Sequence, residues 1–146
     1  MPDVTLTLTG SVPGSTLSDG SGNYTFASLA SGGSYTVTPS KTALTPGTGN
    51  LDIVDVIAVQ KQALTGTFLS GCPLTAADVN GDSAVNTVDV IATQRFFLGQ
   101  LIGTANVGKY QFTPVSRSYP GIGSDQTGQN YDTLIFGDVA SPFVQP

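Results

Sequence analysis

The stretch Asp78-Val-Asn-Gly-Asp-Ser-Ala-Val-Asn-Thr-Val-Asp89 decides how the middle of this 146-residue chain folds. It places oxygen-bearing side chains at positions one, three, five, nine and twelve, counted from Asp78. Such a loop can curl around one hard cation, and calcium takes six to eight oxygen ligands. Polar residues of this kind also form plain turns. The order of the five oxygen residues, followed by an apolar helix, nevertheless predicts a calcium loop.

The predicted ligands follow the pattern of an EF-hand loop. In that pattern position seven contributes its backbone carbonyl, and position twelve closes the site with both carboxylate oxygens. Two positions differ from it, since position twelve is Asp instead of Glu and position six is Ser83 instead of Gly. Position nine binds directly or through a water. The expected ligand set is Asp78, Asn80, Asp82, the carbonyl of Ala84, Asn86 and Asp89.

This loop belongs to the second copy of an internal repeat. Val54-Asp-Val-Ile-Ala-Val-Gln-Lys61 recurs as Val88-Asp-Val-Ile-Ala-Thr-Gln-Arg95, at a shift of 34 residues. Each copy is interpreted as a loop followed by a helix. Two short amphipathic helices bury little surface alone, so we expect them to pack as a pseudo-twofold pair. The predicted contact faces are Val56, Ile57, Ala63 and Leu64 in the first helix, and Val90, Ile91, Phe97 and Leu98 in the second.

The first copy keeps only part of the loop's oxygens. Positions one, three and five hold Leu44, Pro46 and Thr48, whereas positions nine and twelve keep the acids Asp52 and Asp55. Three interpretations are open: the loop binds no ion, it forms a second and weaker calcium site, or Asp55 caps its helix. The possible second site comprises Thr48, Asn50, Asp52 and Asp55 together with backbone carbonyls.

Residues 44–100 resemble a type I dockerin, a duplicated module of calcium loops and helices. The resemblance rests on Asp78-Val-Asn-Gly-Asp82, Val85-Asn86, Asp89 and Gln94-Arg-Phe-Phe-Leu-Gly99. It implies a cohesin-like receptor as partner, contacted by loop positions ten and eleven and by a basic pair on each helix. The first loop lacks the usual acidic start, and the recognition pairs are not the usual small hydroxyl residues. The implied contact residues are Thr87, Val88, Gln94, Arg95, Ile53, Val54, Gln60 and Lys61.

Period-two patterns flank the repeat on both sides. Alternating β-branched or aromatic residues with Gly-rich turns between them predict half-buried antiparallel strands. The predicted strands span residues 4–9, 23–27, 34–39, 109–114 and 130–136.

These flanks resemble the prealbumin-like B domains of bacterial surface proteins, which are related to collagen-adhesin B repeats. The resemblance rests on Leu17-Ser-Asp-Gly-Ser-Gly-Asn-Tyr-Thr-Phe26, Leu29, Gly33-Ser-Tyr-Thr-Val-Thr-Pro39 and Phe112-Thr-Pro-Val-Ser-Arg117. It implies a mostly β fold, in which an antiparallel sandwich is interrupted by the dockerin-like pair. We expect residues 1–40 and 107–146 to form the sandwich and residues 41–106 the small α insertion. Consecutive separate domains are the alternative.

Composition narrows the function. The net charge is −5, all ten acidic residues are Asp, and the chain has no His and one Cys. The chain has no cluster of Lys and Arg that would indicate nucleic-acid binding. It also has no apolar run that approaches the ~20 residues of a membrane span. Without His or Glu a general base near neutral pH is hard to supply, and nothing pairs Asp125, Asp132 or Asp138 as a glycosidase would require. We therefore expect no enzyme, and Cys72 is expected to lie in a loop.

The expected function is a non-catalytic, calcium-binding structural or adhesion module, with one calcium ion and possibly a second. Low charge and an abundance of Thr, Ser and Gly favour an extracellular module cut from a larger protein. The resemblance to bacterial surface proteins implies the outside or cell surface of a prokaryote. Two alternatives stay open. The helix pair could bind a cohesin-like receptor, or copies of the chain could assemble into a fibre by strand addition at an open sheet edge, expected at the first strand, Asp3 to Thr9.

Overall fold

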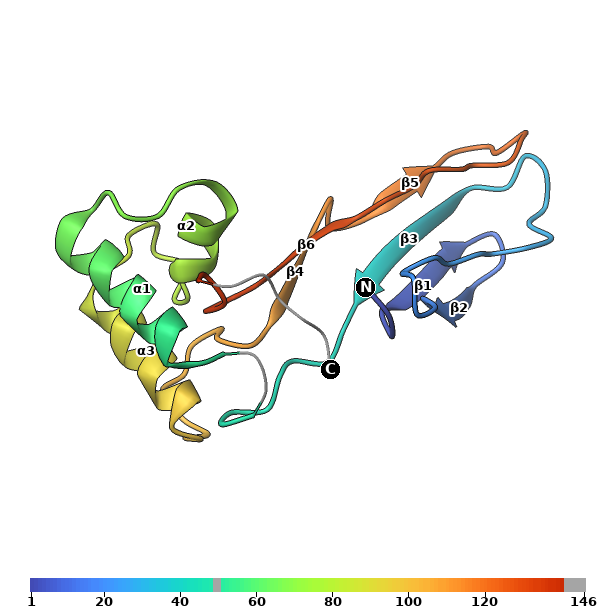
Figure 1. The fold of residues 1–146 in the computed structure, drawn as a ribbon. Coiled ribbons are helices and arrows are strands. Elements are labelled where there is room, and N and C mark those ends of the chain that lie inside the picture. Colours follow the sequence, from blue (N-terminus) through green and yellow to red (C-terminus); the bar gives the residue numbers. More distant parts are fainter. Residues whose placement is uncertain (49–50, 141–146) are drawn as a thin grey trace. The chain divides into compact units, whose positions relative to one another are not determined.

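The computed structural model describes residues 1–48 and 51–140 and contains two antiparallel sheets and three helices within them (Figure 1). Helices and strands involve similar numbers of residues, so the described fold is mixed α and β, not mostly β. The elements are β1 (Thr5–Gly10), β2 (Gly14–Leu17), β3 (Tyr35–Ser40), α1 (Ile53–Thr65), α2 (Gly71–Ala77), α3 (Thr87–Phe97), β4 (Tyr110–Thr113), β5 (Arg117–Tyr119) and β6 (Asp132–Ile135).

The chain divides into two compact units, each built from two chain segments. The first comprises Met1–Lys41 and Phe112–Thr133, and the second comprises Thr42–Gln111 with the described residues from Leu134 onward. Residues 107–111 and 134–140 thus group with the helices, whereas the sequence placed them with the sandwich. The sandwich-and-insertion organisation itself stays a prediction.

The first unit is organised around a four-stranded antiparallel sheet in the order β2-β1-β3-β5. Successive side chains of a strand point to opposite faces, so the Thr-Leu alternation of β1 buries Leu6 and Leu8, while Thr7 between them is exposed. Leu8 lies opposite Val37 of β3, which is also buried. The apolar face of this sheet forms the core of the unit.

Four of the five predicted strands are confirmed, as β1, β3, β4 and β6, with ends shifted by one or two residues. The prediction for residues 23–27 is wrong, because this segment pairs with no described strand, although its exposure still alternates. The sequence did not predict β2 and β5. Both are only three or four residues long; β2 pairs with the neighbouring strand β1, whereas β5 pairs with β3, which is distant in sequence.

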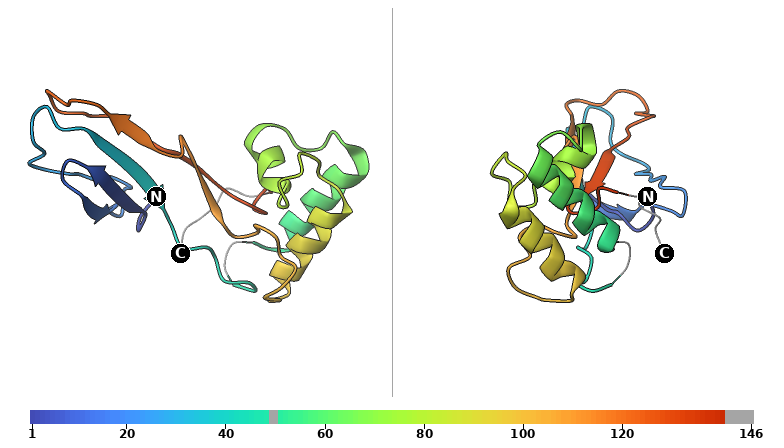
Figure 2. Two further views of the ribbon diagram at one scale, coloured as in Figure 1. Left: turned by 180° about the vertical axis from the view of Figure 1, so that it is seen from behind. Right: turned by 60° about the vertical axis from the view of Figure 1, so that its left-hand side comes forward.

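In the second unit α1 and α3 lie side by side and pack against each other (Figures 1 and 2). The predicted contact faces are only partly right: Val56 is buried as expected, whereas Ile57, Leu64, Ile91 and Leu98 are all at least 43% exposed. Most of the inward face begins at the closing Asp of each loop and follows positions i, i+3, i+4 and i+7. Its buried residues are Asp55, Val56, Ala58, Val59 and Gln62 in α1, and Asp89, Ala92, Thr93 and Phe96 in α3.

A compact apolar cluster fixes these helices to the loops around them. Leu44 and Phe136 pack against it, and its buried members are Leu51, Val79, Ala92, Phe96 and Val107. Gly108 is required beside it, because a Cβ at this position would approach the Phe96 ring to 2.5 Å.

Cys72 is an exposed free cysteine in α2, so its assignment to a loop is wrong. Its neighbour Pro73 lies in the first turn of that helix, where the missing backbone N–H needs no partner. Proline here therefore allows a helix in a stretch that looked like a turn.

Candidate functional site

The predicted calcium loop is folded back onto its first residue. Oδ1 of Asp78 accepts hydrogen bonds from the backbone N–H groups of Gly81 (2.9 Å) and Asp82 (3.1 Å), and Oδ2 accepts from that of Ser83 (2.8 Å). Gly81 and Ser83 both have left-handed backbones, with φ of 75° and 69°. Glycine adopts this conformation without strain whereas serine does not, so the departure at position six carries a conformational cost.

Asp89, the closing residue, ties the two ends of the loop together. Its side chain is completely buried. Oδ1 accepts from the backbone N–H groups of Val79 (2.9 Å) and Asn80 (3.2 Å), and Oδ2 accepts from that of Asn86 (2.9 Å). Asn86 in turn caps α3, so the two residues form a capping box. This carboxylate connects the loop to the first turn of the helix.

The middle of the loop gathers the other predicted ligands around Asp82. Its Oδ2 accepts from Nδ2 of Asn80 (2.8 Å) and from Nδ2 of Asn86 (3.5 Å), which also lies 3.3 Å from the carbonyl of Ala84. Oδ1 atoms of Asp78 and Asn80 face one shared donor, the Asp82 N–H, at 3.1 and 3.0 Å. The hydrogen bond from Asn80 is the main cause of the lowered pKa of Asp82.

Asparagine side chains can supply oxygen to the same point by rotating the amide through 180°, since one end is a carbonyl and the other an NH₂. For Asn80 this rotation would break the bond from its Nδ2 to Asp82 Oδ2, although the Asp82 N–H would keep its bond to Asp78. For Asn86 it would break the cap that Oδ1 makes to the Val88 N–H (2.8 Å). Water-mediated contact is therefore the role for Asn86 that preserves the helix cap.

Charge at the loop is unbalanced. Its three carboxylates form no ion pair with any Lys or Arg in the described part of the chain. Within residues 1–48 and 51–140, no three His, Cys, Asp or Glu side chains are grouped so that they could hold a metal ion by themselves. An ion bound here would depend on amide and backbone oxygens as well, which suits calcium more than a transition metal.

The first repeat has the same cap and the same buried acid. Asp55 is completely buried, and its Oδ2 accepts from the backbone N–H of Asp52 (3.0 Å). Asp52 is the N-cap of α1 and accepts from the N–H groups of Val54 (2.6 Å) and Asp55 (3.4 Å), and the latter bond completes a capping box. Oδ1 of Asp55 accepts from the backbone N–H groups of Val139 (2.9 Å) and Ala140 (3.0 Å). Asp55 therefore takes part in capping α1 and also binds a segment that the sequence did not predict, while ion binding by this loop stays a prediction.

Thr48, another residue of the possible second calcium site, is not brought to Asp55 in this way. Thr48 donates its hydroxyl to the Thr45 carbonyl at 2.6 Å, and no hydrogen bond between described residues joins it to Asp52 or Asp55. Asn50 lies outside the described residues.

Asp138 takes a place near Asp55 instead. Partial burial, together with the negative charges of Asp55 and Asp52, raises its pKa to about 6. Sequence reasoning considered Asp138 only as a possible catalytic acid. The signal that could have placed it is the dipeptide Asp-Val, which follows a small residue at both 78–79 and 138–139.

The implied receptor contacts are all exposed, at repeated positions of α1 and α3. They are Ile53, Val54, Gln60 and Lys61 in the first helix, and Thr87, Val88, Gln94 and Arg95 in the second. Lys61 places its ammonium 5.0 Å from the centroid of the Phe68 ring, which shields part of an otherwise open aromatic side chain.

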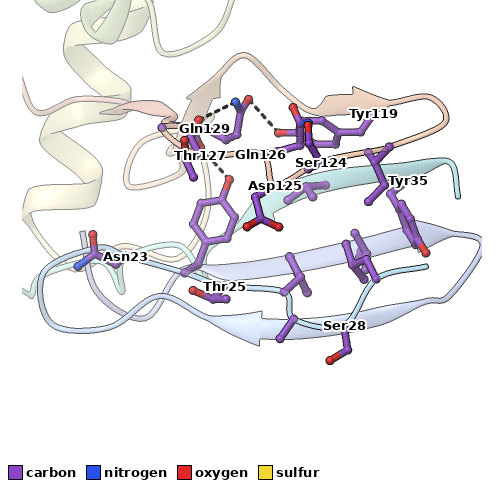
Figure 3. Close-up of a pocket in the computed structure, with 18 of the residues that line it drawn as sticks. Asn23, Thr25, Ser28, Tyr35, Tyr119, Ser124, Asp125, Gln126, Thr127 and Gln129 are labelled. Carbon is purple, nitrogen blue, oxygen red and sulfur yellow. Dashed lines mark hydrogen bonds between the residues drawn. The ribbon is translucent and has the colours of Figure 1, made fainter. Parts of the chain in front are cut away.

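A groove of about 920 Å³ lies in the first unit, between residues 22–31, residues 122–130 and the sheet (Figure 3). Tyr24 donates its hydroxyl to the Gln129 carbonyl (2.7 Å), and Tyr119 donates to Gln129 Oε1 (3.1 Å). Asp125 is the one charged side chain among the described residues that line it. Aromatic rings and amides therefore dominate its surface.

Comparison with protein-family models, with curated proteins and with solved structures gave no match to this chain. No helix among the described residues is long and apolar enough to cross a membrane.

Proposed function

We propose that this chain is a non-catalytic, calcium-binding structural module of a prokaryotic secreted or cell-surface protein. The observation that carries the proposal is the loop of residues 78–89. Hydrogen bonds connect Asp78, Asn80, Asp82, Asn86 and the carbonyl of Ala84 there, and Asn86 is bonded in turn to Asp89. Such a series of oxygen-bearing residues in one loop supports the proposal.

Calcium would act as a clamp between the loop and α3. The start of the loop is attached to α3 through hydrogen bonds to Asp89 and through Val79, which belongs to the same apolar cluster as Phe96. An ion held by Asp78, Asp82 and Asp89 would add a further attachment and would neutralise their mutual repulsion. Because it would bind the folded loop and not the unfolded chain, calcium at a hundredfold excess over its Kd should stabilise the fold by about 2.7 kcal/mol.

At the level of architecture we infer a dockerin-like repeat pair within a prealbumin-like sandwich. The equivalent burial of α1 and α3 at positions 34 residues apart supports the repeat pair. The four-stranded sheet, with Leu6, Leu8 and Val37 on one buried face, supports one layer of a sandwich.

A calcium titration tests the function. The full chain is unfolded thermally in EDTA and in rising calcium, with circular dichroism at 222 nm reporting on the helices. Asp82→Ala should remove most of the calcium-dependent rise in the midpoint. Asp19→Ala is the matched control, because Asp19 is also exposed and accepts from backbone N–H groups two and four residues ahead. Equal responses of wild type and Asp82→Ala to calcium would overturn the proposal.

A second candidate function is docking of a protein receptor on the exposed sides of α1 and α3. It is favoured by the repeated apolar pair Val54 and Val88, which are 51% and 55% exposed. Titration calorimetry with purified cohesins would test it. Val54→Asp with Val88→Asp should abolish any binding, whereas Val12→Asp, at a 51% exposed site outside the helices, should not. Absence of binding to every cohesin class tried would remove this candidate.

A third candidate is fibre formation by strand addition. The open edge expected at residues 3–9 is not there, because β1 pairs with both β2 and β3. The candidate is favoured instead by residues 24–29. No backbone N–H or C=O of this segment is hydrogen-bonded to another described residue, and it borders the groove beside the sheet. An added strand would pair such groups. Sedimentation velocity over a hundredfold concentration range should then show assembly that Thr25→Pro prevents. A monomer at all concentrations would exclude it.

A further inference from the structure

We infer that residues 137–140 replace the loop segment that the first repeat lacks. We infer also that α1 and α3 are stably packed only when this segment is hydrogen-bonded to Asp55. The segment takes, beside Asp55, the place that residues 77–80 take beside Asp89. This inference concerns the protein fold alone and does not depend on calcium.

The hydrogen bonds of the two closing acids match atom for atom. In each repeat Oδ2 accepts from the backbone N–H three residues earlier, at 3.0 Å for Asp55 and 2.9 Å for Asp89. In each repeat Oδ1 accepts from two successive backbone N–H groups. These donors are Val79 (2.9 Å) and Asn80 (3.2 Å) at Asp89, and Val139 (2.9 Å) and Ala140 (3.0 Å) at Asp55.

The sequences of the two donor segments also match. Ala77-Asp-Val-Asn80 corresponds to Gly137-Asp-Val-Ala140, with Asp and Val shared and a small residue at each end. By the repeat shift, the first loop should begin at Leu44. The Leu44 N–H donates instead to the Gly108 carbonyl (2.9 Å), and the Gly47 N–H to that of Phe96 (2.8 Å). The segment that precedes α1 in sequence therefore bonds elsewhere, and a distant segment replaces it.

Packing at Gly137 fixes the displaced segment independently of the carboxylate. Gly137 is buried, and its N–H donates to the Ala76 carbonyl at 2.8 Å. Its φ of 91° favours glycine, and a Cβ here would come within 2.8 Å of Val107 and 3.0 Å of Leu51. The position therefore accepts only glycine if the two donors that follow are to reach Asp55.

The buried carboxylate of Asp55 couples the binding of residues 137–140 to the stability of the helices. Without residues 139–140, Oδ1 of a fully buried side chain would lose both of its donors. An unpaired buried charge is strongly unfavourable. Loss of the segment and loss of the carboxylate should therefore destabilise the helices through one shared interaction.

A double-mutant cycle in the full chain tests this coupling, in EDTA, with helix unfolding followed at 222 nm. Gly137→Ala and Asp55→Ala should each lower the midpoint by about 5 °C or more. Their combined loss should be smaller than the sum of the single losses by about 3 °C or more. The control pairs Gly137→Ala with Asp89→Ala, the equivalent acid that the segment does not touch, and there the losses should add. Additive losses in both pairs would overturn the inference.

Amide hydrogen exchange on the unmodified chain keeps the test decisive if a variant fails to fold. The N–H groups of Val139 and Ala140 should exchange at least about 100-fold more slowly than unprotected amides, as should those of Val79 and Asn80. Unprotected exchange at Val139 and Ala140 beside protected Val79 and Asn80 would show that the segment does not close the first repeat.

Discussion

Replacing Asp89 by Ala separates the structural role of this carboxylate from its proposed role as a ligand. Three backbone N–H groups lose the Asp89 carboxylate as acceptor, and that of Val79, a residue with no exposed surface, keeps only its bond to the Ala77 carbonyl (3.0 Å). A hydrogen bond to a charged group contributes about 1.5–3 kcal/mol when buried. The N–H groups of Asn80 and Asn86 are only partly buried, so water can replace part of their bonds. We expect a loss of about 3–5 kcal/mol in total.

Urea unfolding followed at 222 nm measures this loss, first in EDTA and then in saturating calcium. The gap between wild type and Asp89→Ala should be about 3–5 kcal/mol in EDTA and should widen by about 2.7 kcal/mol at a calcium concentration of a hundred times the Kd. Asp89→Asn should cost less in EDTA, because its amide carbonyl can still accept from Val79 and Asn80.

The two readouts can fail separately. A gap below about 1 kcal/mol in EDTA would refute the hydrogen-bond argument. A gap of the expected size that calcium leaves unchanged would instead refute ligation by Asp89 and leave its structural role intact.

Three further predictions concern strain, packing and charge. Ser83→Gly should raise stability by about 1 kcal/mol and tighten calcium binding, because Ser83 has φ 69°; a lower midpoint in urea would contradict it. Phe96→Ala should lower the free energy of unfolding by about 3–5 kcal/mol, since Phe96 is 2% exposed. Leu98→Ala, at a 61% exposed site, should change it by under about 0.5 kcal/mol. Equal effects of the two substitutions would show that Phe96 does not belong to the core. Asp138 has a pKa of about 6 in the fold and about 4 when unfolded, so the fold binds its proton more tightly and loses stability as pH rises through this window. In EDTA, Asp138→Asn should therefore raise the midpoint of unfolding at pH 7 and leave it unchanged near pH 4. A lower midpoint at pH 7 would contradict the argued repulsion of Asp138 by Asp52 and Asp55.

Local sequence pattern was enough to predict the position of several strands, two helices and one loop of this chain. The strand alternation of residues 4–9 and 34–39 located β1 and β3, because a strand's side chains alternate whatever it pairs with. The repeat located α1 and α3, and the oxygen spacing located the loop of residues 78–89. Its folding is governed by hydrogen bonds within twelve residues, so neighbouring predicted positions are linked in the structure. Ion binding there stays a prediction.

Tertiary structure decided what local pattern could not. The inward faces of the helices are set by Asp55 and Asp89, whose carboxylates turn toward backbone N–H groups outside their own helices. Hydrophobic periodicity alone favoured the neighbouring faces, because it gives no weight to a buried charge that finds donors. Val139 and Ala140 donate to Asp55 across more than eighty residues, and residues 23–27 keep a strand's alternation without pairing with any described strand. In each case, whether a hydrogen-bonding group finds a partner depends on a distant segment, which the local sequence does not specify.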